Sequence, residues 1–234
     1  MSRTVAALLA VVFAIVAAFA AHAGASAGGE RPCAAYDSHI PSPAHFAKTI
    51  DNPYFPLPAG RTFIYRGVEN GKKELDRMHV TRRTKMIAGI KATVVSDNVY
   101  EPPPKLLEKT FDYYAQDDRG NVWYLGEETK ELLGGGKVDR SGSWLTGMSG
   151  AKPGLIMEVD PRVPDAYRQE CLSGEAEDLA WVVGRRSSVV RTLEFSPLEP
   201  TVVERKVYKR GMGVVSEHQL SGGHEVLSLV RLVG

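Results

Sequence analysis

The sequence has little of several features that would point to a common function class. Its formal net charge over 234 residues is only +1, so no basic surplus is present to bind nucleic acid or an anionic membrane surface. Its histidines form no HxH or HExxH pattern, the spacing typical of a zinc site. It has no Gly-x-Ser-x-Gly elbow, and "GGGK" at 134–137 lacks the rest of a P-loop. We therefore expect no nucleic-acid partner and no cofactor.

Cysteine is also scarce, since the chain holds only Cys33 and Cys171. In an oxidising compartment two cysteines have one possible intramolecular pairing. A reactive thiol is the alternative, but it would need a nearby base. We predict a Cys33–Cys171 disulfide, which would close a long loop and stabilise the fold by about 4 kcal/mol in the chain-entropy description.

Charge is almost absent from the first residues of the chain. Arg3 precedes an apolar run from Val5 to Ala21, and Ala21-His22-Ala23 follows as a small-residue cleavage motif. This order is typical of a secretory signal peptide, although an uncleaved anchor helix is an alternative. We predict a signal peptide over 1–23, a secreted or periplasmic location, and no membrane span once the signal is removed.

Helical periodicity is rare after the signal. Residues 24–50 read as a flexible segment with one short helix at 42–49, where Ser42 is a candidate N-cap and Pro43 the first helical residue. Beyond them, short runs rich in Val, Ile, Thr, Tyr and Trp alternate with Gly and Asn turns. The predicted strands cover 62–68, 75–82, 85–87 with 91–100, 108–116, 121–126, 129–133, 166–170, 179–185, 189–195, 202–209, 214–220 and 226–233.

The connections between these strands are too short for crossover helices, so the strands should pair antiparallel. We predict one mainly β domain over 51–234, a meander forming a curved antiparallel sheet or a barrel. The Gly-rich and Pro-rich segment 134–165 is a long loop with apolar residues, which we expect to pack across the mouth of such a barrel.

The stretch "FDYYAQDDRGNVWYLGEET" at 111–129 concentrates acids and aromatic residues. It does not fit an EF-hand loop that starts at Asp117, because position 3 is Arg119 and position 6 is Val122 instead of glycine. Its flanks alternate like strands. We predict a hairpin, with Gly120 and Asn121 at positive φ.

Acids crowd a second stretch, "YRQECLSGEAEDLAW" at 167–181. Such acids usually lie solvated on a turn. A divalent-cation site, calcium by its oxygen ligands, and a salt-bridge network with Arg168 are the alternatives. The candidate metal ligands are Glu170, Glu175, Glu177 and Asp178.

The aromatic residues give the clearest indication of function. Aromatic-lined cavities in β folds hold small ligands, although core packing is the other interpretation. The candidate ligand-binding residues are Trp123, Tyr124, Trp144 and Trp181, meeting the acids Glu127, Glu170, Glu175 and Asp178. We predict an exported protein that binds a small or apolar ligand without catalysis. The alternatives are the divalent-cation site and an enzyme with a carboxylate pair, and the oligomeric state stays open.

Several stretches together resemble a family of uncharacterised secreted bacterial proteins. They are "DNPYFPLPAG", "DYYAQDDRGNVWYLGEET", "GSWLTGMSGAKPGLIM", "YRQECLSGEAEDLA" and "PLEPTVVERKVYKRGMGVV", in order across most of residues 50–216. The resemblance implies export and a β-rich domain. It implies no activity and no catalytic residue.

Overall fold

The computed structural model describes residues 33, 36–47 and 49–234. The predicted signal peptide and much of the predicted flexible segment lie outside the described residues. Within the described part of the chain, no helix is long and apolar enough to cross a membrane.

Almost all of the regular secondary structure in the described chain is β-strand. Their bounds are β1 Thr62–Glu69, β2 Lys72–Ile87, β3 Ile90–Glu101, β4 Lys105–Gln116, β5 Val122–Glu128, β6 Glu131–Gly134, β7 Lys137–Asp139, β8 Trp144–Leu145, β9 Gly154–Met157, β10 Ala166–Arg168, β11 Leu179–Arg186, β12 Val189–Phe195, β13 Val203–Lys209, β14 Gly213–Ser221 and β15 Glu225–Val233. The predicted segments 75–82 and 85–87 join into one strand, β2, which has a register shift between Val80 and Thr84.

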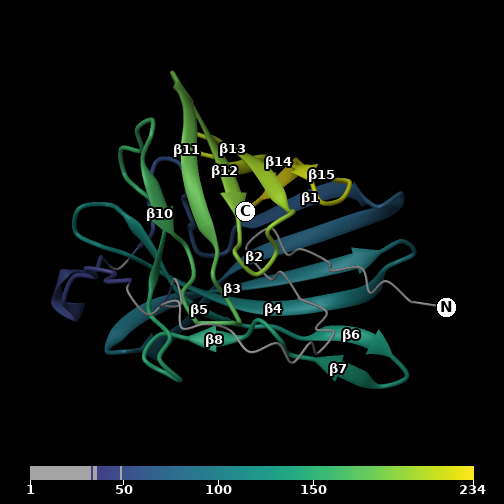
Figure 1. The fold of residues 1–234 in the computed structure, drawn as a ribbon, viewed down its shortest axis with the longest axis horizontal. Helices are drawn as coiled ribbons and strands as arrows, with labels where there is room; N and C mark the ends of the chain where they lie inside the picture. The colour runs from purple at the N-terminus through teal and green to yellow at the C-terminus, as the bar shows by residue number, and fades with distance from the viewer. Residues whose placement is uncertain (1–32, 34–35, 48) are drawn as a thin grey trace, which may run out of the picture.

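All fifteen strands belong to one antiparallel sheet. The order is β10-β11-β12-β13-β14-β15-β1-β2-β3-β4-β5-β8, with β6 beside β4, β7 beside β6, and β9 beside β5. Figure 1 shows the upright strand β11 crossing the nearly horizontal strands β2 to β4 at a steep angle, as expected of a strongly twisted sheet. The predicted curved antiparallel sheet is confirmed, and the barrel alternative is wrong because the ordered path from β10 to β8 does not close.

The hairpin predicted around Gly120 is also confirmed. Tyr114 pairs with Tyr124, and Gln116 with Val122. Gly120 has φ +92°, and a Cβ atom there would lie 2.9 Å from a methyl group of Val159. Asn121 is not at positive φ, contrary to the prediction. Its backbone N–H donates to Asp117 Oδ1, and its side-chain oxygen accepts from the N–H of Val159, so it shapes the turn by hydrogen bonds.

The helix predicted over 42–49 is reduced to a single 3-10 turn, η1, at Pro43–His45. Ser42 makes no side-chain cap, and Phe46 is already extended. Phe46 forms a β-bridge with Asp117, and the N–H of Ala47 donates to the carbonyl of Gln116. Backbone groups that a helix over 42–49 would have hydrogen-bonded internally therefore pair with the end of β4 instead.

Two apolar clusters lie on opposite faces of the sheet around β3 to β5. The main core, on the inner face, includes Tyr65, Tyr114, Tyr124 and Trp144. The smaller cluster, on the outer face, includes Tyr113, Trp123 and Leu125, with Phe46 and Leu155 packed against it. Segment 134–165 does pack, but through β8 and β9 along β5, not across a barrel mouth.

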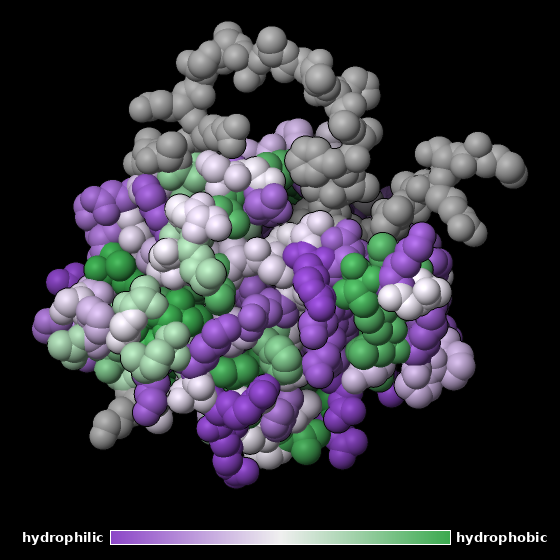
Figure 2. Space-filling view, turned by 90° about the horizontal axis from the view of Figure 1, so that it is seen from below, coloured by the Kyte–Doolittle hydropathy of each residue, from purple (hydrophilic) through white to green (hydrophobic). Residues whose placement is uncertain are grey.

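The predicted disulfide joins Cys33 to Cys171, with Cα atoms 5.5 Å apart. It ties the N-terminal segment to the loop after β10. Elsewhere the face seen in Figure 2 carries separate hydrophobic patches divided by hydrophilic side chains.

Candidate functional site

Carboxylates are buried in unusual number, most of them on the inner face of the sheet. The described acids that are less than a tenth exposed are Glu69, Glu74, Asp76, Asp97, Glu108, Asp112, Asp117, Glu127, Glu131, Glu170, Glu177, Asp178, Glu194, Glu204, Glu217 and Glu225. Among the described Lys and Arg residues, only Lys206 and Arg168 are buried to the same degree. An ionised carboxylate is costly to bury without a partner, so these groups need either protons or a cation.

Strand alternation brings the acids to the same face. On β4, Glu108, Thr110, Asp112 and Tyr114 occupy every second position and are all buried. In the neighbouring strands Asp112 lies opposite Glu127, and Glu108 lies opposite Glu131. Like charges directly opposite one another destabilise a sheet, so this pattern indicates a role other than stability.

We call Asp112, Glu127, Glu170 and Asp178 the Glu127 cluster. Glu127 is 1% exposed, and neither of its carboxylate oxygens has a hydrogen-bond partner among the described residues. Burial raises the pKa of Glu127 well above its ordinary value, and the carboxylates of Glu170, Asp112 and other nearby acids raise it further. Burial likewise raises the pKa of Asp178, to about 7. The cluster therefore holds excess negative charge whenever it is ionised.

Three aromatic rings form one wall of this cluster. The rings of Tyr114 and Tyr124 stack 4.8 Å apart, and Trp144 meets Tyr124 edge-on at 5.4 Å. The Tyr124 hydroxyl donates to Asp112 Oδ1 at 2.8 Å. The Tyr114 hydroxyl is buried without a hydrogen-bond partner, and the charges of Asp112 and Glu127 act on it. Tyr114 therefore offers a further polar group to a ligand beside the acids.

A groove of about 240 Å³ lies next to this cluster, with Glu127 in its lining. It is lined by Glu127, Glu128, Ser143, Trp144, Leu145, Met148, Ser149 and Leu172. Pockets for drug-sized ligands measure about 300–1,000 Å³, so this groove suits a smaller molecule. Polar and apolar lining groups occur together, with Glu127 and Trp144 at the buried end.

The structure brings together only part of each predicted site. Tyr124 and Trp144 meet Glu127, Glu170 and Asp178, as the ligand-site hypothesis requires.

The remaining candidate residues lie elsewhere. Trp123 faces the outer cluster and donates from its indole N–H to Asp117 Oδ2 at 2.9 Å. Trp181 is on β11 and 44% exposed. Glu175 is exposed, and the Glu177 carboxylate accepts a hydrogen bond from the N–H of Gly174 within its own loop. The four acids proposed as metal ligands are thus divided between the interior and the loop.

Asp112 and Tyr114 were not among the site residues predicted from the sequence. The available signal was an acid inside an alternating strand, at a position where an apolar side chain is usual. Thr110, Asp112, Tyr114 and Gln116 share one face of β4, which shows that this face is polar as well as aromatic.

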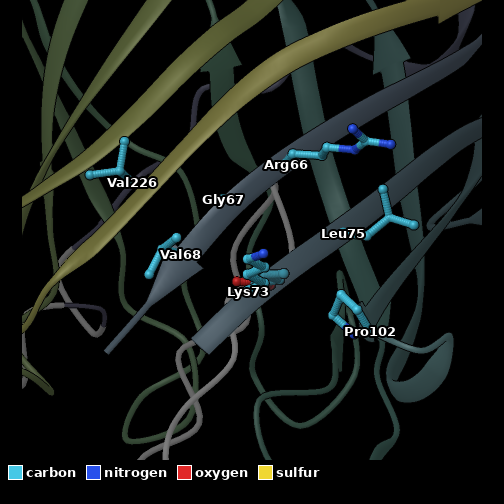
Figure 3. Close-up of a pocket in the computed structure, with 8 residues that line it drawn as sticks. Arg66, Gly67, Val68, Lys73, Leu75, Pro102 and Val226 are labelled. Carbon is cyan, nitrogen blue, oxygen red and sulfur yellow. The ribbon is translucent and has the colours of Figure 1, made fainter. Parts of the chain in front are cut away.

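A second, larger groove of about 700 Å³ lies over β1, β2 and β15. It is lined by Arg66, Gly67, Val68, Lys73, Glu74, Leu75, Pro102 and Val226. Figure 3 shows these residues along the paired strands, with the Val68 and Val226 side chains on the same side of the sheet. Glu74 belongs to the lining of this groove and also lies close enough to the interior acids for their charges to act on it. Burial, and then Glu69, Glu108 and Asp97, raise the pKa of Glu74 to about 8.

Solved structures align with this chain only at low TM-scores and low sequence identity. No family model and no curated protein matches the chain. A crystal structure from Bacteroides fragilis, described as an exported protein with a YmcC-like fold, aligns with a TM-score of 0.44 and 12% identity, covering 77% of this chain and 99% of that one. A crystal structure from Parabacteroides distasonis, described as a lipoprotein, aligns with a TM-score of 0.38 and 9% identity, covering 78% of this chain and 99% of that one.

Proposed function

We propose that this protein is exported and binds a small ligand with a cationic group, without catalysis, in the groove above the Glu127 cluster. The observation that carries the proposal is the Glu127 carboxylate, which is buried with both oxygens unpartnered and with other carboxylates around it. A ligand ammonium would replace the missing counter-charge. This narrows the predicted small or apolar ligand to one that has both a positive charge and apolar groups.

The aromatic wall supports an organic cation. Tyr114, Tyr124 and Trp144 present ring surfaces and edges next to the acids. Cation–π contact with Trp or Tyr is worth about 0.5–2 kcal/mol, more when the cation is desolvated. Leu145, Met148 and Leu172 in the groove lining would contact alkyl groups of the ligand.

Export is supported by separate observations. The leader at 1–23 has the order of a signal peptide, and the resemblance to a secreted family implies the same. The Cys33–Cys171 disulfide is suited to an oxidising compartment.

Choline binding followed by tryptophan fluorescence tests the proposed function, with uncharged 3,3-dimethyl-1-butanol as the matched neutral analogue. We expect choline to bind and the alcohol not to. Glu127→Gln should weaken choline binding about tenfold or more, because it removes the coulombic attraction between the carboxylate and the quaternary ammonium, and tenfold corresponds to about 1.4 kcal/mol. Glu175→Gln, at an exposed acid, is the control and should bind choline like the wild type.

The pH dependence sharpens this test. Choline keeps its charge at every pH, whereas a carboxylate must be ionised to attract it. Because the pKa of Glu127 is raised, its carboxylate ionises only at higher pH, and choline affinity should increase as the pH rises. Equal affinity for choline and its neutral analogue would refute the proposal, and chemical conversion of the ligand would favour the enzyme alternative.

A further inference from the structure

We propose that Glu204, Glu217 and Glu225 form a second site, which binds a divalent cation of the calcium class. One carboxylate oxygen from each residue lies within 4.8 Å of those of the other two. We call these residues the glutamate triad. The triad shares no residue with the groove above the Glu127 cluster, so this inference goes beyond the proposed function.

Three neighbouring strands supply the triad. Glu204 lies on β13, Glu217 on β14 and Glu225 on β15, and each side chain is at most 3% exposed. The sheet pairs these strands in that order, and alternation turns the three side chains inward. Carboxylates held by adjacent strands form a more rigid ligand set than acids on a loop.

Hydrogen bonds do not account for these carboxylates. Apart from the contact of Glu217 Oε2 with Lys206, the described residues offer no hydrogen-bond partner to either oxygen of Glu217 or to one oxygen each of Glu204 and Glu225. Outside the triad, Glu74 on β2 is also buried with both oxygens unpartnered, and its charge acts on Glu225. Native proteins pair almost all buried polar groups, so unpartnered oxygens converging from four strands indicate a missing ligand.

Lys206 neutralises only part of this charge. Its Nζ lies 3.1 Å from Glu194 Oε2 and 3.5 Å from Glu217 Oε2. The other charged groups that act on the triad are carboxylates, including Glu69, which lies opposite Glu225 in the sheet. Lys206 thus supplies one positive charge to a group of six buried acids. The six are Glu69, Glu74, Glu194, Glu204, Glu217 and Glu225. The excess of negative charge would be reduced by a divalent cation.

The ligand atoms and their burial favour calcium. Ca²⁺ binds six to eight oxygen ligands at about 2.3–2.6 Å in flexible geometry, and the triad oxygens, all within 4.8 Å of one another, are close enough to share one ion. Mg²⁺ needs near-ideal octahedral geometry and gives up its water reluctantly, which disfavours it in a buried set of carboxylates.

Isothermal titration calorimetry with CaCl₂ tests the second site on the chelator-treated mature protein at pH 8. We expect one Ca²⁺ per chain, bound more tightly than Mg²⁺, and a rise in Tm with Ca²⁺ by mass action. Glu217→Gln and Glu225→Gln should each weaken Ca²⁺ binding at least tenfold. Glu225→Gln removes a buried charge outside the Lys206 ion pairs, so its Tm without Ca²⁺ should not fall.

Glu127→Gln and Glu175→Gln serve as controls and should bind Ca²⁺ like the wild type. Wild-type protein that binds no Ca²⁺ at pH 8, or Ca²⁺ binding that is lost in Glu127→Gln but kept in Glu225→Gln, would overturn the proposal. Choline binding is a separate readout, so the two proposed sites can fail independently.

Discussion

Lys206 and Glu127 are both buried ionisable residues, but their neighbours affect their charged forms in opposite ways. Lys206 is fully buried, and burial disfavours its ammonium, but Glu194, Glu217 and Glu204 outweigh this effect and raise its pKa. Glu127 is equally buried, yet the charges acting on it are those of other acids, and its pKa is raised because the carboxylate is disfavoured. Lys206 is thus held as an ion by its neighbours, whereas Glu127 needs a proton or a bound cation.

Lys206→Met tests the structural role of this lysine. Removing one partner of a buried ion pair leaves the other charge uncompensated, which typically costs about 3–5 kcal/mol. We expect a loss of that size in the free energy of unfolding, measured by urea denaturation at pH 7. Lys209→Met, at an exposed position on the same strand, is the control. A loss below about 1 kcal/mol for Lys206→Met would show that the ion pair is dispensable.

For single residues, some site positions could be predicted from the sequence, and others could not for a physical reason. The disulfide partners followed from the cysteine count alone. Trp123 and Tyr124 were grouped because they are aromatic neighbours, yet adjacent residues in a strand point to opposite faces, and only Tyr124 reaches the Glu127 cluster. Trp181 belongs to the distant half of the sheet, a separation that no local pattern reveals.

At the scale of single elements, β5 depends on Gly126. Tyr124 lies opposite Tyr114, and Glu127 lies opposite Asp112, so β5 has one residue more than β4 between these two pairs. This is a β-bulge, and Gly126 within it has φ +134°. Strict alternation would place Tyr124 and Glu127 on opposite faces, and the bulge brings both to the inner one.

Gly126→Ala should therefore disrupt the site. A Cβ atom at this position would lie 2.2 Å from the carbonyl oxygen of Trp144, and its backbone conformation disfavours side chains. We expect a loss of stability of about 2 kcal/mol or more and a changed fluorescence spectrum as Trp144 is displaced. Gly211→Ala is a matched control, because Gly211 also has positive φ but has no atom within 4 Å of the added Cβ. An equal loss in both variants would mean that φ alone, and not the contact with Trp144, sets the cost.

The elements themselves were largely predictable. Alternation and turn residues located most of the strands, including 189–195, which matches β12 (Val189–Phe195). The helix over 42–49 failed because its end pairs with the sheet near Asp117, which is distant in sequence. Bulges such as that at Gly126 are equally hard to foresee, since they depend on the register of the partner strand.

At the scale of the whole molecule, the sheet encloses an acidic interior. Its open topology is shown by the strand order, but sequence patterns did not distinguish an open sheet from a barrel, because closure depends on whether the edge strands β10 and β8 meet. The buried acids come from strands on both halves of the sheet. We infer that these carboxylates are compensated only in part within the protein and are neutralised by bound cations.

The stability of the unliganded protein follows from this claim. Burial raises the pKa of Glu74 and of Glu108 to about 8, and that of Glu225 to about 9. In the unfolded chain these glutamates titrate near 4.5. The folded state therefore holds more protons between these values, and its free energy of unfolding falls as the pH rises.

Thermal unfolding of the chelator-treated mature protein from pH 5 to pH 9 measures this most directly. We predict that the Tm falls steadily across this range, and that Ca²⁺ at pH 8 to 9 restores part of the loss. A Tm that stays constant or rises from pH 5 to pH 9 would contradict the account, because it would show that the buried carboxylates are already neutralised by partners within the fold.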